Sequence, residues 1–392
     1  MSVAHNQLRV ARELWKRLHP LDRGVPARLQ ALLADRRFGS RDRRLYRELL
    51  FTALRHARPL AALAGLEELA WAARLATACA DSRETEAFRA AFAPAAPPAP
   101  PHPLDLVPAW FSNEADAGAP APAVAAALLA RAPVWVRLDP AHSDEAHAEW
   151  DARGWTSQPH PVLTSARRLP PETGVTACSS YLNGRYEVQD LGSQALLAAL
   201  DLPARSPGPR WLDACAGAGG KTLQLAALLG PAARIDAADV RTSALVELRA
   251  RAARAGLASR IRTLPRANTG ELYDGVLVDA PCSGSGTWRR APHLMACTGE
   301  AELAAAARLQ SLILAESAPH VRPGGLLVYA TCSIARLENE SVAAAFIATH
   351  GDRFLAEPSA LDLGFPRLPH GLAITPGHWD NDGFYLAVFR RR

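Results

Sequence analysis

Short apolar segments alternate with helix-patterned segments from about residue 189 to the end of the sequence. The apolar segments predict strands at 211–213, 234–238, 261–264, 275–279 and 326–331, and a final hairpin over 371–375 and 384–390. The helices predicted between them span 192–201, 220–229, 242–255, 300–320 and 336–349. This alternation predicts an α/β fold with a doubly wound, Rossmann-like sheet, in which ligands bind beyond the carboxyl ends of the strands.

The first 92 residues have a different pattern, which predicts an all-α domain. Leucines recur at steps of three and four residues, for example over 45–54. Proline and glycine separate the predicted helices, and we expect Ser40 to cap a helix that starts near Arg41. Further helix is expected over 66–92.

Two smaller parts separate this domain, at 1–92, from the α/β domain at 189–392. Residues 93–130 are predicted to be a linker rich in proline and alanine and a connecting helix. Within this part, 93–103 should be extended, 111–122 loop-like and 123–131 helical. Residues 131–188 are predicted to be a small α+β domain, with strands at 134–138, near 161–163 and at 186–188 and a helix at 143–152.

Positive charge is concentrated at one end of the chain. The net charge is +5, but residues 1–60 alone carry 14 Lys/Arg against 5 Asp/Glu. The remaining chain is therefore slightly acidic, at about −4. This distribution favours an N-terminal domain that contacts a phosphate backbone, although an arginine-rich solvated surface would look the same.

The composition also argues against several classes of protein. No long apolar segment predicts a membrane span, and the N-terminus does not resemble a secretory signal. The six cysteines include no CxxC pair, so we expect neither a metal site nor a disulfide framework. The sequence predicts a reduced, cytoplasmic protein, which we expect to be a monomer.

A glycine-rich segment at 212–222 joins a predicted strand to a predicted helix. Three types of nucleotide-binding loop could account for this segment. A P-loop would need glycine where Cys215 stands, and a dinucleotide fingerprint would need glycine at Thr222. A loop for S-adenosyl-L-methionine requires only the glycine-rich turn and an acid after the next strand, where Asp239 lies. Asp239 is also well placed to cap the helix that follows.

The predicted cofactor site comprises ten residues: Cys215, Ala216, Gly217, Ala218, Gly219, Gly220, Lys221, Asp239, Asn268 and Asp279. Lys221 is one of only two lysines in the chain, where arginine otherwise supplies the basic side chains. A retained ammonium in this motif indicates a role that a planar guanidinium cannot fill.

Two cysteines follow two of the predicted strands. Cys282 lies in Asp-Ala-Pro-Cys-Ser-Gly (279–284), and Cys332 lies in Thr-Cys-Ser (331–333). In a parallel sheet, both thiols should reach the same carboxyl edge, beside the glycine-rich turn. Methylation of a pyrimidine at C5 needs such a set: a thiolate that adds to C6, a second group that assists release, and an acid that holds the base. Cys332, Cys282, Asp279 and Lys221 are the candidates.

A single free cysteine is more often a small buried apolar residue than a nucleophile. We therefore assign packing roles to Cys79, Cys178 and Cys297, which lack a motif, and a structural role to Cys215.

These motifs resemble the Fmu/Sun family, the small-subunit ribosomal RNA methyltransferase B group of RNA 5-methylcytosine enzymes. The resemblance rests on CAGAGGKT (215–222), DAPCSG (279–284) and TCS (331–333), with VQDLGSQ (188–194) upstream and DGF (382–384) downstream. It covers about 130–392 well. Residues 6–90 are more loosely similar to a NusB-like RNA-binding domain.

The resemblance implies a role for each candidate. Cys332 would attack the base, Cys282 would promote release of the product, and Lys221 and Asp279 would contact the target cytosine. It implies S-adenosyl-L-methionine as cofactor and RNA, most of all 16S ribosomal RNA, as substrate. The small domain would face the RNA.

The chain departs from the family pattern at three positions. Ala218 replaces the proline of the glycine-rich motif, and Asp139 replaces a family asparagine. No acid occurs over 264–268, so Asn268 is the candidate for the adenine end of the cofactor.

Three alternatives remain open from the residues alone. A P-loop ATPase or kinase would tolerate loss of both cysteines. A catalytically silent RNA-binding scaffold would bind RNA without methyl transfer. The same chemistry on transfer RNA would change only the substrate. In each RNA-binding case we expect Arg36, Arg37, Arg41, Arg43 and Arg44 to bind phosphates and not to read bases.

Overall fold

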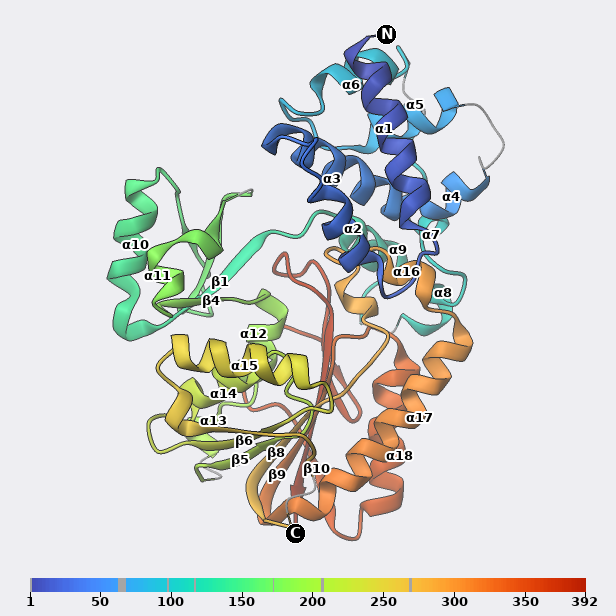
Figure 1. The fold of residues 1–392 in the computed structure, drawn as a ribbon. Coiled ribbons are helices and arrows are strands. Elements are labelled where there is room, and N and C mark those ends of the chain that lie inside the picture. The colour runs from blue at the N-terminus through green and yellow to red at the C-terminus, as the bar shows by residue number, and fades with distance from the viewer. Residues whose placement is uncertain are drawn as a thin grey trace.

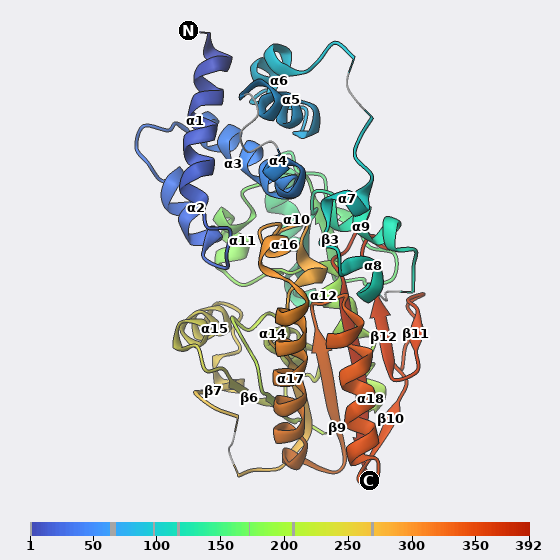
Figure 2. The ribbon, with the colours of Figure 1, turned by 90° about the vertical axis from the view of Figure 1, so that its right-hand side faces the viewer.

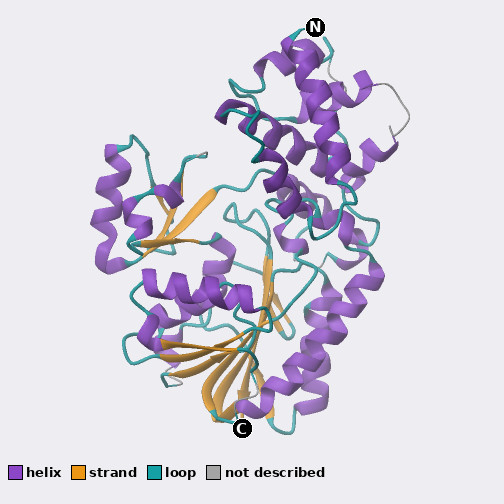
Figure 3. Cartoon of the chain, in the orientation of Figure 1, coloured by secondary structure: helices purple, strands orange, loops and turns teal. Residues whose placement is uncertain are grey.

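The structure is a computed structural model that describes residues 2–62, 68–96, 99–115, 118–171, 173–205, 208–267 and 270–392. A helical part carries the N-terminus, a small α+β part lies to one side, and a large sheet with helices on both faces carries the C-terminus (Figures 1 and 3). No helix in the described residues has the length and apolar composition needed to cross a membrane.

The large sheet has nine strands in the order β11-β12-β13-β9-β8-β5-β6-β7, with β10 beside β13. Its strands are β5 (Arg210–Asp213), β6 (Arg234–Ala238), β7 (Ile261–Leu264), β8 (Tyr273–Asp279), β9 (Val321–Thr331), β10 (Phe354–Glu357), β11 (Arg367–Leu368), β12 (Gly371–Ile374) and β13 (Phe384–Arg391). Strands β5 to β9 are parallel, and β13 pairs antiparallel with β9. The α/β fold predicted from the alternation is confirmed.

Helices cover both faces of this sheet, and each face has its own apolar core. Helices α12 (Leu191–Ala198), α14 (Gly220–Leu228) and α15 (Thr242–Arg254) pack on one face. Helices α17 (Glu300–Ser317) and α18 (Glu340–His350) pack on the other, where Figure 2 shows them in front of β9. The short helices α13 (Leu202–Arg205) and α16 (Leu294–Cys297) complete this part.

The small α+β part has a four-stranded antiparallel sheet in the order β2-β3-β1-β4. It comprises β1 (Val134–Leu138), α10 (Ser143–Ala152), β2 (Gln158–Pro159), β3 (Ala166–Leu169), α11 (Ser179–Leu182) and β4 (Tyr186–Val188). The strand predicted near 161–163 is wrong, because these residues form the turn between β2 and β3. Here the backbone N–H groups of Val162 and Leu163 donate to the His160 ring, at 3.3 and 3.0 Å, instead of to a strand.

The N-terminal part is helical, as predicted, and buries leucines and aromatic residues in one core. Its helices are α1 (Val3–Leu18), α2 (Val25–Leu33), α3 (Ser40–Arg55), α4 (Ala57–Ala62), α5 (Glu68–Ala78) and α6 (Glu86–Phe92). Ser40 is the first residue of α3 and not its cap. Gly39 is the cap, and its N–H donates to the Asp42 carboxylate at 3.1 Å.

The segment between these parts is more ordered than its composition indicates. It contains α7 (Pro103–Leu106), α8 (Phe111–Glu114) and α9 (Ala121–Leu129), so the loop predicted over 111–122 is only partly correct. The reason is tertiary packing. Trp110 and Phe111 contact Trp288 with ring centroids 5.7 Å away, and Trp110 Nε1 donates to the Thr298 carbonyl oxygen at 2.8 Å. The division of the chain at 92, 130 and 188 stays a prediction.

Candidate active site

The glycine-rich turn connects β5 to α14 at the carboxyl edge of the sheet. Gly219 has a φ of +86°, and a Cβ there would lie 2.7 Å from Leu248 Cγ, so glycine is required. The Gly217 N–H donates to Asp239 Oδ2 at 2.9 Å. The acid predicted for the cofactor therefore lies directly beside the turn. It also accepts the Arg241 backbone N–H at 2.8 Å, but Arg241 itself is the N-cap of α15 and no side chain caps that helix, so the alternative capping role is wrong.

Asp239 is a buried carboxylate that remains charged. Burial alone would raise its pKa, but hydrogen bonds from the Arg241 side chain and from two backbone N–H groups outweigh burial and lower it. Asp213, at the end of β5, behaves oppositely. Burial raises its pKa to about 7, although Thr222 Oγ1 donates to it at 2.7 Å.

Cys215 lies in the turn but has no nucleophilic character. Burial, followed by the charges of Asp213 and Asp279, raises its pKa to about 12, so the thiol is protonated. This agrees with the structural role expected from the sequence.

The two motif cysteines meet at the ends of neighbouring strands. Strands β8 and β9 are parallel, with Asp279 paired to Ala330; Cys332 follows β9 directly, and Cys282 is the third residue after β8. Cys282 Sγ and Cys332 Sγ are 3.3 Å apart, although the residues are 50 positions apart in sequence. The hydrogen bond with Cys332, and then burial, raise the pKa of Cys282 well above that of an ordinary thiol. Cys282 therefore keeps its proton.

Lys221 connects the glycine-rich turn to the strand that carries Asp279. Lys221 Nζ lies 2.9 Å from Asp279 Oδ2 and 5.1 Å from the centroid of the Phe384 ring, which belongs to the DGF element. Burial would lower the pKa of Lys221, but the Asp279 carboxylate outweighs it and raises the pKa. The structure thus brings Lys221, Asp279 and the two cysteines together.

Glu338 holds the two cysteine loops together, and sequence reasoning missed it. Its fully buried carboxylate accepts the Ser283 N–H at 2.8 Å and Gln310 Nε2 at 3.0 Å. The hydroxyl groups of Ser283 and Ser333, the residues that follow Cys282 and Cys332, also donate to it. Only its position five residues after Ser333 could have suggested this role.

The upstream and downstream elements of the family pattern also meet here. Asp190 of VQDLGSQ caps α12 by accepting the Gly192 N–H at 2.7 Å, and it accepts the Asp382 N–H of DGF at 3.1 Å. Arg290, eight residues after Cys282, pairs with both carboxylates. These contacts fix DGF beside the loop that carries Cys282.

The structure describes two of the three positions that depart from the family pattern. At position 218 the backbone carbonyl oxygen accepts Arg251 Nη1 at 3.0 Å, and Arg251 pairs with Glu187 of β4, so the small α+β part supports the glycine-rich turn. Asp139 caps a short turn by accepting the Ala141 N–H at 3.2 Å. The third candidate, Asn268, lies outside the described residues.

Comparison with known proteins places the chain in a family. A family model described as 16S rRNA methyltransferase RsmB/F matches residues 201–390. The ribosomal RNA small subunit methyltransferase B of Klebsiella pneumoniae strain 342 is 35% identical over 269 residues, 67% of this chain and 60% of the relative. That of Xylella fastidiosa is 32% identical over 295 residues, 71% of this chain and 66% of the relative. The chain belongs to the RsmB/F family.

This is the Fmu/Sun family of the sequence resemblance, which is confirmed. The family description and the names of the relatives agree with the predicted enzyme class, an RNA methyltransferase, for which S-adenosyl-L-methionine is the predicted cofactor. The alignment with the first relative spans only about 60% of that relative's length.

Solved structures support the fold over the whole chain. The structure of PH0851 superposes with a TM-score of 0.77 at 21% identity and covers 99% of both chains. A methyltransferase homolog from Pyrococcus horikoshii has a TM-score of 0.58 at 26% identity and covers 69% of this chain and 90% of that one.

Proposed function

We propose that this chain transfers a methyl group from S-adenosyl-L-methionine to C5 of a cytosine in RNA, through a covalent bond between Cys332 and C6 of the base. The observation that carries the proposal is the 3.3 Å approach of the Cys282 and Cys332 sulfurs at the ends of two parallel strands. The names of the relatives and of the family favour 16S ribosomal RNA as the substrate.

The chemistry explains why two thiols are needed. Cytosine C5 is a weak nucleophile, and thiolate addition at C6 converts it into an enamine carbon that can accept a methyl group. The Cys332 sulfur forms a bond to C6, C5 gains the methyl group and loses its proton to a base, and the C6–S bond then breaks. Cys282 promotes this last stage. The target cytosine must leave its stack to reach the thiol.

The assignment of the two thiols rests on the motif resemblance and on the protonation of Cys282. The pKa of Cys282 is raised well above the ordinary range, so this thiol keeps its proton and does not suit a nucleophile. The nucleophile is therefore assigned to Cys332 of the Thr-Cys-Ser motif, whose sulfur lies 3.3 Å away. Cys282 keeps a proton beside the same sulfur, where it can assist departure.

Lys221 and Asp279 are proposed to hold the base. The Asp279 carboxylate would accept from the N3/N4 edge of the cytosine, and the Lys221 ammonium would contact its carbonyl oxygen. Their N and O atoms lie 2.9 Å apart, and the Asp279 carboxylate raises the pKa of Lys221, so the ammonium stays charged in a largely buried position. Because these groups are already in position, little reorganisation is needed to stabilise the charge that develops on the cytosine ring during the reaction.

The residues of the glycine-rich turn fit the cofactor. S-adenosyl-L-methionine is a methyl donor with a sulfonium, an ammonium and two ribose hydroxyls, all of which are complemented by carboxylates. Asp239 and Asp279 provide two carboxylates around the turn. The proposed site is the ten-residue set of the sequence analysis: Cys215, Ala216, Gly217, Ala218, Gly219, Gly220, Lys221, Asp239, Asn268 and Asp279.

The proposal is tested with purified protein, tritiated S-adenosyl-L-methionine and undermodified small-subunit rRNA. Wild type, Cys332→Ala, Cys282→Ala and the control Cys297→Ala are compared, and denaturing gels detect covalent RNA–protein adducts. We expect label transfer by wild type and Cys297→Ala, no transfer by Cys332→Ala, and an accumulated adduct with Cys282→Ala.

Other outcomes would change the proposal in defined ways. An adduct with Cys332→Ala instead would exchange the two cysteine roles. Transfer to transfer RNA but not to rRNA would keep the chemistry and change the substrate. Cofactor and RNA binding without transfer to any RNA would favour the silent scaffold.

A further inference from the structure

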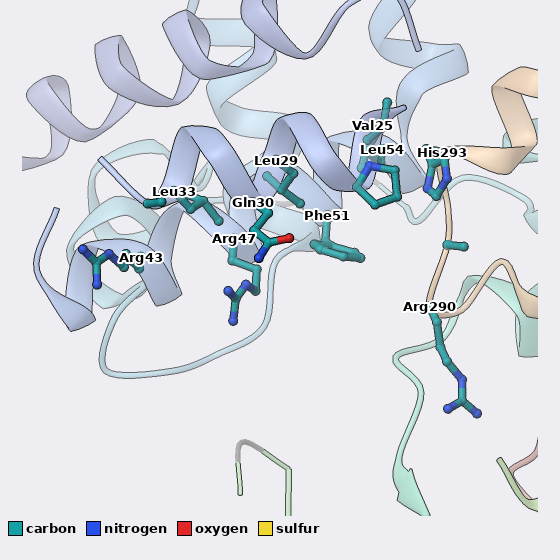
Figure 4. Close-up of a pocket in the computed structure, with 13 residues that line it drawn as sticks. Val25, Leu29, Gln30, Leu33, Arg43, Arg47, Phe51, Leu54, Arg290 and His293 are labelled. Carbon is teal, nitrogen blue, oxygen red and sulfur yellow. The ribbon is translucent and has the colours of Figure 1, made fainter. Parts of the chain in front are cut away.

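A groove of about 670 Å³ lies where the helical N-terminal part meets the loop that follows the Cys282 motif. Helices α2 and α3 form one side, and Arg290, Ala291 and His293 form the other (Figure 4). Its volume is typical of ligand-binding pockets. Of its lining residues, Arg290 supports the two-cysteine site through its pair with Asp382, but the chemistry proposed above gives the groove itself no role.

The wall on the helical side is apolar. Val25, Leu29, Leu33 and Leu54 line it, and all four pack into the N-terminal core. Phe51 is only half-buried, and its ring borders the opening. A partly exposed aromatic ring beside apolar side chains is the kind of surface on which an unpaired nucleic-acid base stacks.

The rim of the groove is basic. Arg43, Arg47 and Phe51 follow each other at four-residue steps and so share one face of α3. Arg43 and Arg47 are exposed, and within the described ranges neither lies within 4.0 Å of a carboxylate. Arg47 and Arg290 extend toward the same open side (Figure 4). Unpaired guanidinium groups beside a stacking surface are complementary to a phosphate backbone.

The groove is fixed relative to the reacting residues. Arg23, in the loop between α1 and α2, donates from Nη2 to the Cys282 carbonyl oxygen at 3.5 Å. Arg290 reaches the DGF element through its pair with Asp382. An RNA strand bound in the groove would therefore have a defined register with respect to the cysteines.

We propose that this groove binds an unstacked nucleotide of the substrate RNA, flanking the target cytosine. Its base packs on Phe51 and the apolar wall, and the adjoining phosphates contact Arg43 and Arg47. The inference rests on the proposed function in one respect, that RNA is the substrate. It adds a second binding site, and it predicts that single-stranded RNA is preferred over duplex RNA at this position.

The test measures binding of a labelled single-stranded RNA oligonucleotide, and of a duplex of equal length, to the full chain over a range of salt concentrations. Arg43→Gln and Arg47→Gln should each reduce the slope of log Kd against log salt by about 0.7 for the single strand. Phe51→Leu should weaken single-strand binding about tenfold without changing that slope, and should leave duplex binding unchanged. Arg308→Gln, an exposed arginine of α17, is the matched control.

Two results would overturn the inference: unchanged slopes in both arginine variants, or equal losses for single strand and duplex with Phe51→Leu. Thermal unfolding of each variant excludes a folding defect. Methyl transfer by wild type is measured in parallel. If wild type transfers methyl groups but the groove variants bind RNA as wild type does, the inference about the groove is wrong and the proposed function stands. If the groove variants weaken RNA binding but wild type transfers no methyl group, the inference about the groove stands and the proposed function is wrong.

Discussion

At the scale of single residues, Glu338 determines how the two thiols meet. Its carboxylate accepts from two N–H groups and two serine hydroxyls, so Glu338→Gln replaces a charged acceptor of four bonds by a neutral amide with only one acceptor oxygen. We expect a loss of about 1–3 kcal/mol in the free energy of unfolding and a lower kcat, with little change in the Kd for RNA. Urea denaturation and single-turnover transfer measure the two effects. Glu316→Gln, on the exposed face of α17, is the control and should change neither.

Asp213 predicts a pH dependence of stability at the same scale. Burial raises its pKa from the ordinary 3.8 to about 7 in the folded state. Its contribution to stability is therefore fully present below about pH 4 and is lost as pH rises through 7. Asp213→Asn keeps an acceptor for Thr222 but cannot ionise. Relative to wild type, the free energy of unfolding of the variant should therefore increase by a few kcal/mol as the pH rises from about 4 to 7. Urea denaturation at a series of pH values measures this, and parallel curves would contradict it.

At the scale of elements, the strands of the parallel sheet were predictable because buried parallel strands are continuous apolar runs. Strand β3 was not, since Ala-Arg-Arg-Leu has little apolar character and is defined by backbone pairing with β1. Helix α8 could not be predicted because the burial of Phe111 depends on residues distant in the sequence, such as Trp288. The same dependence on distant contacts limits how much of the candidate site can be predicted from the sequence. Motif residues such as Cys282 could be named from sequence, but a support such as Glu338 depends on contacts between separate elements.

The contact between β4 and α15 provides a prediction at this scale. Glu187 is buried and pairs with Arg251 and Arg254, and Arg251 in turn holds the Ala218 carbonyl oxygen of the glycine-rich turn. Glu187→Gln should lower the free energy of unfolding by about 3 kcal/mol and raise the Kd for S-adenosyl-L-methionine, as measured by calorimetry. Glu145→Gln, which breaks the exposed pair with Arg185, should cost about 0–1 kcal/mol and leave that Kd unchanged.

At the scale of the whole molecule, the excess of positive charge over residues 1–60 lies on the helical part, away from the α/β sheet (Figure 1). Not all of these positively charged side chains are available to bind RNA. Arg37 pairs with Asp35, and Arg44 pairs with Glu84, whereas Arg36 has no carboxylate partner within the described part of the chain. Arg36 and Arg43 should therefore contribute more to phosphate binding than Arg37 and Arg44.

This difference is tested by charge reversal. Arg36→Glu should weaken RNA binding several-fold at low salt, and the effect should shrink as salt screens the interaction. Arg37→Glu should also lose binding, but part of its effect will come from repulsion by Asp35, so the unfolding free energy should fall with it. Filter binding across a salt series, with thermal unfolding of both variants, separates the two contributions. Equal binding by wild type and Arg36→Glu at low salt would mean that the RNA approaches the molecule from another side.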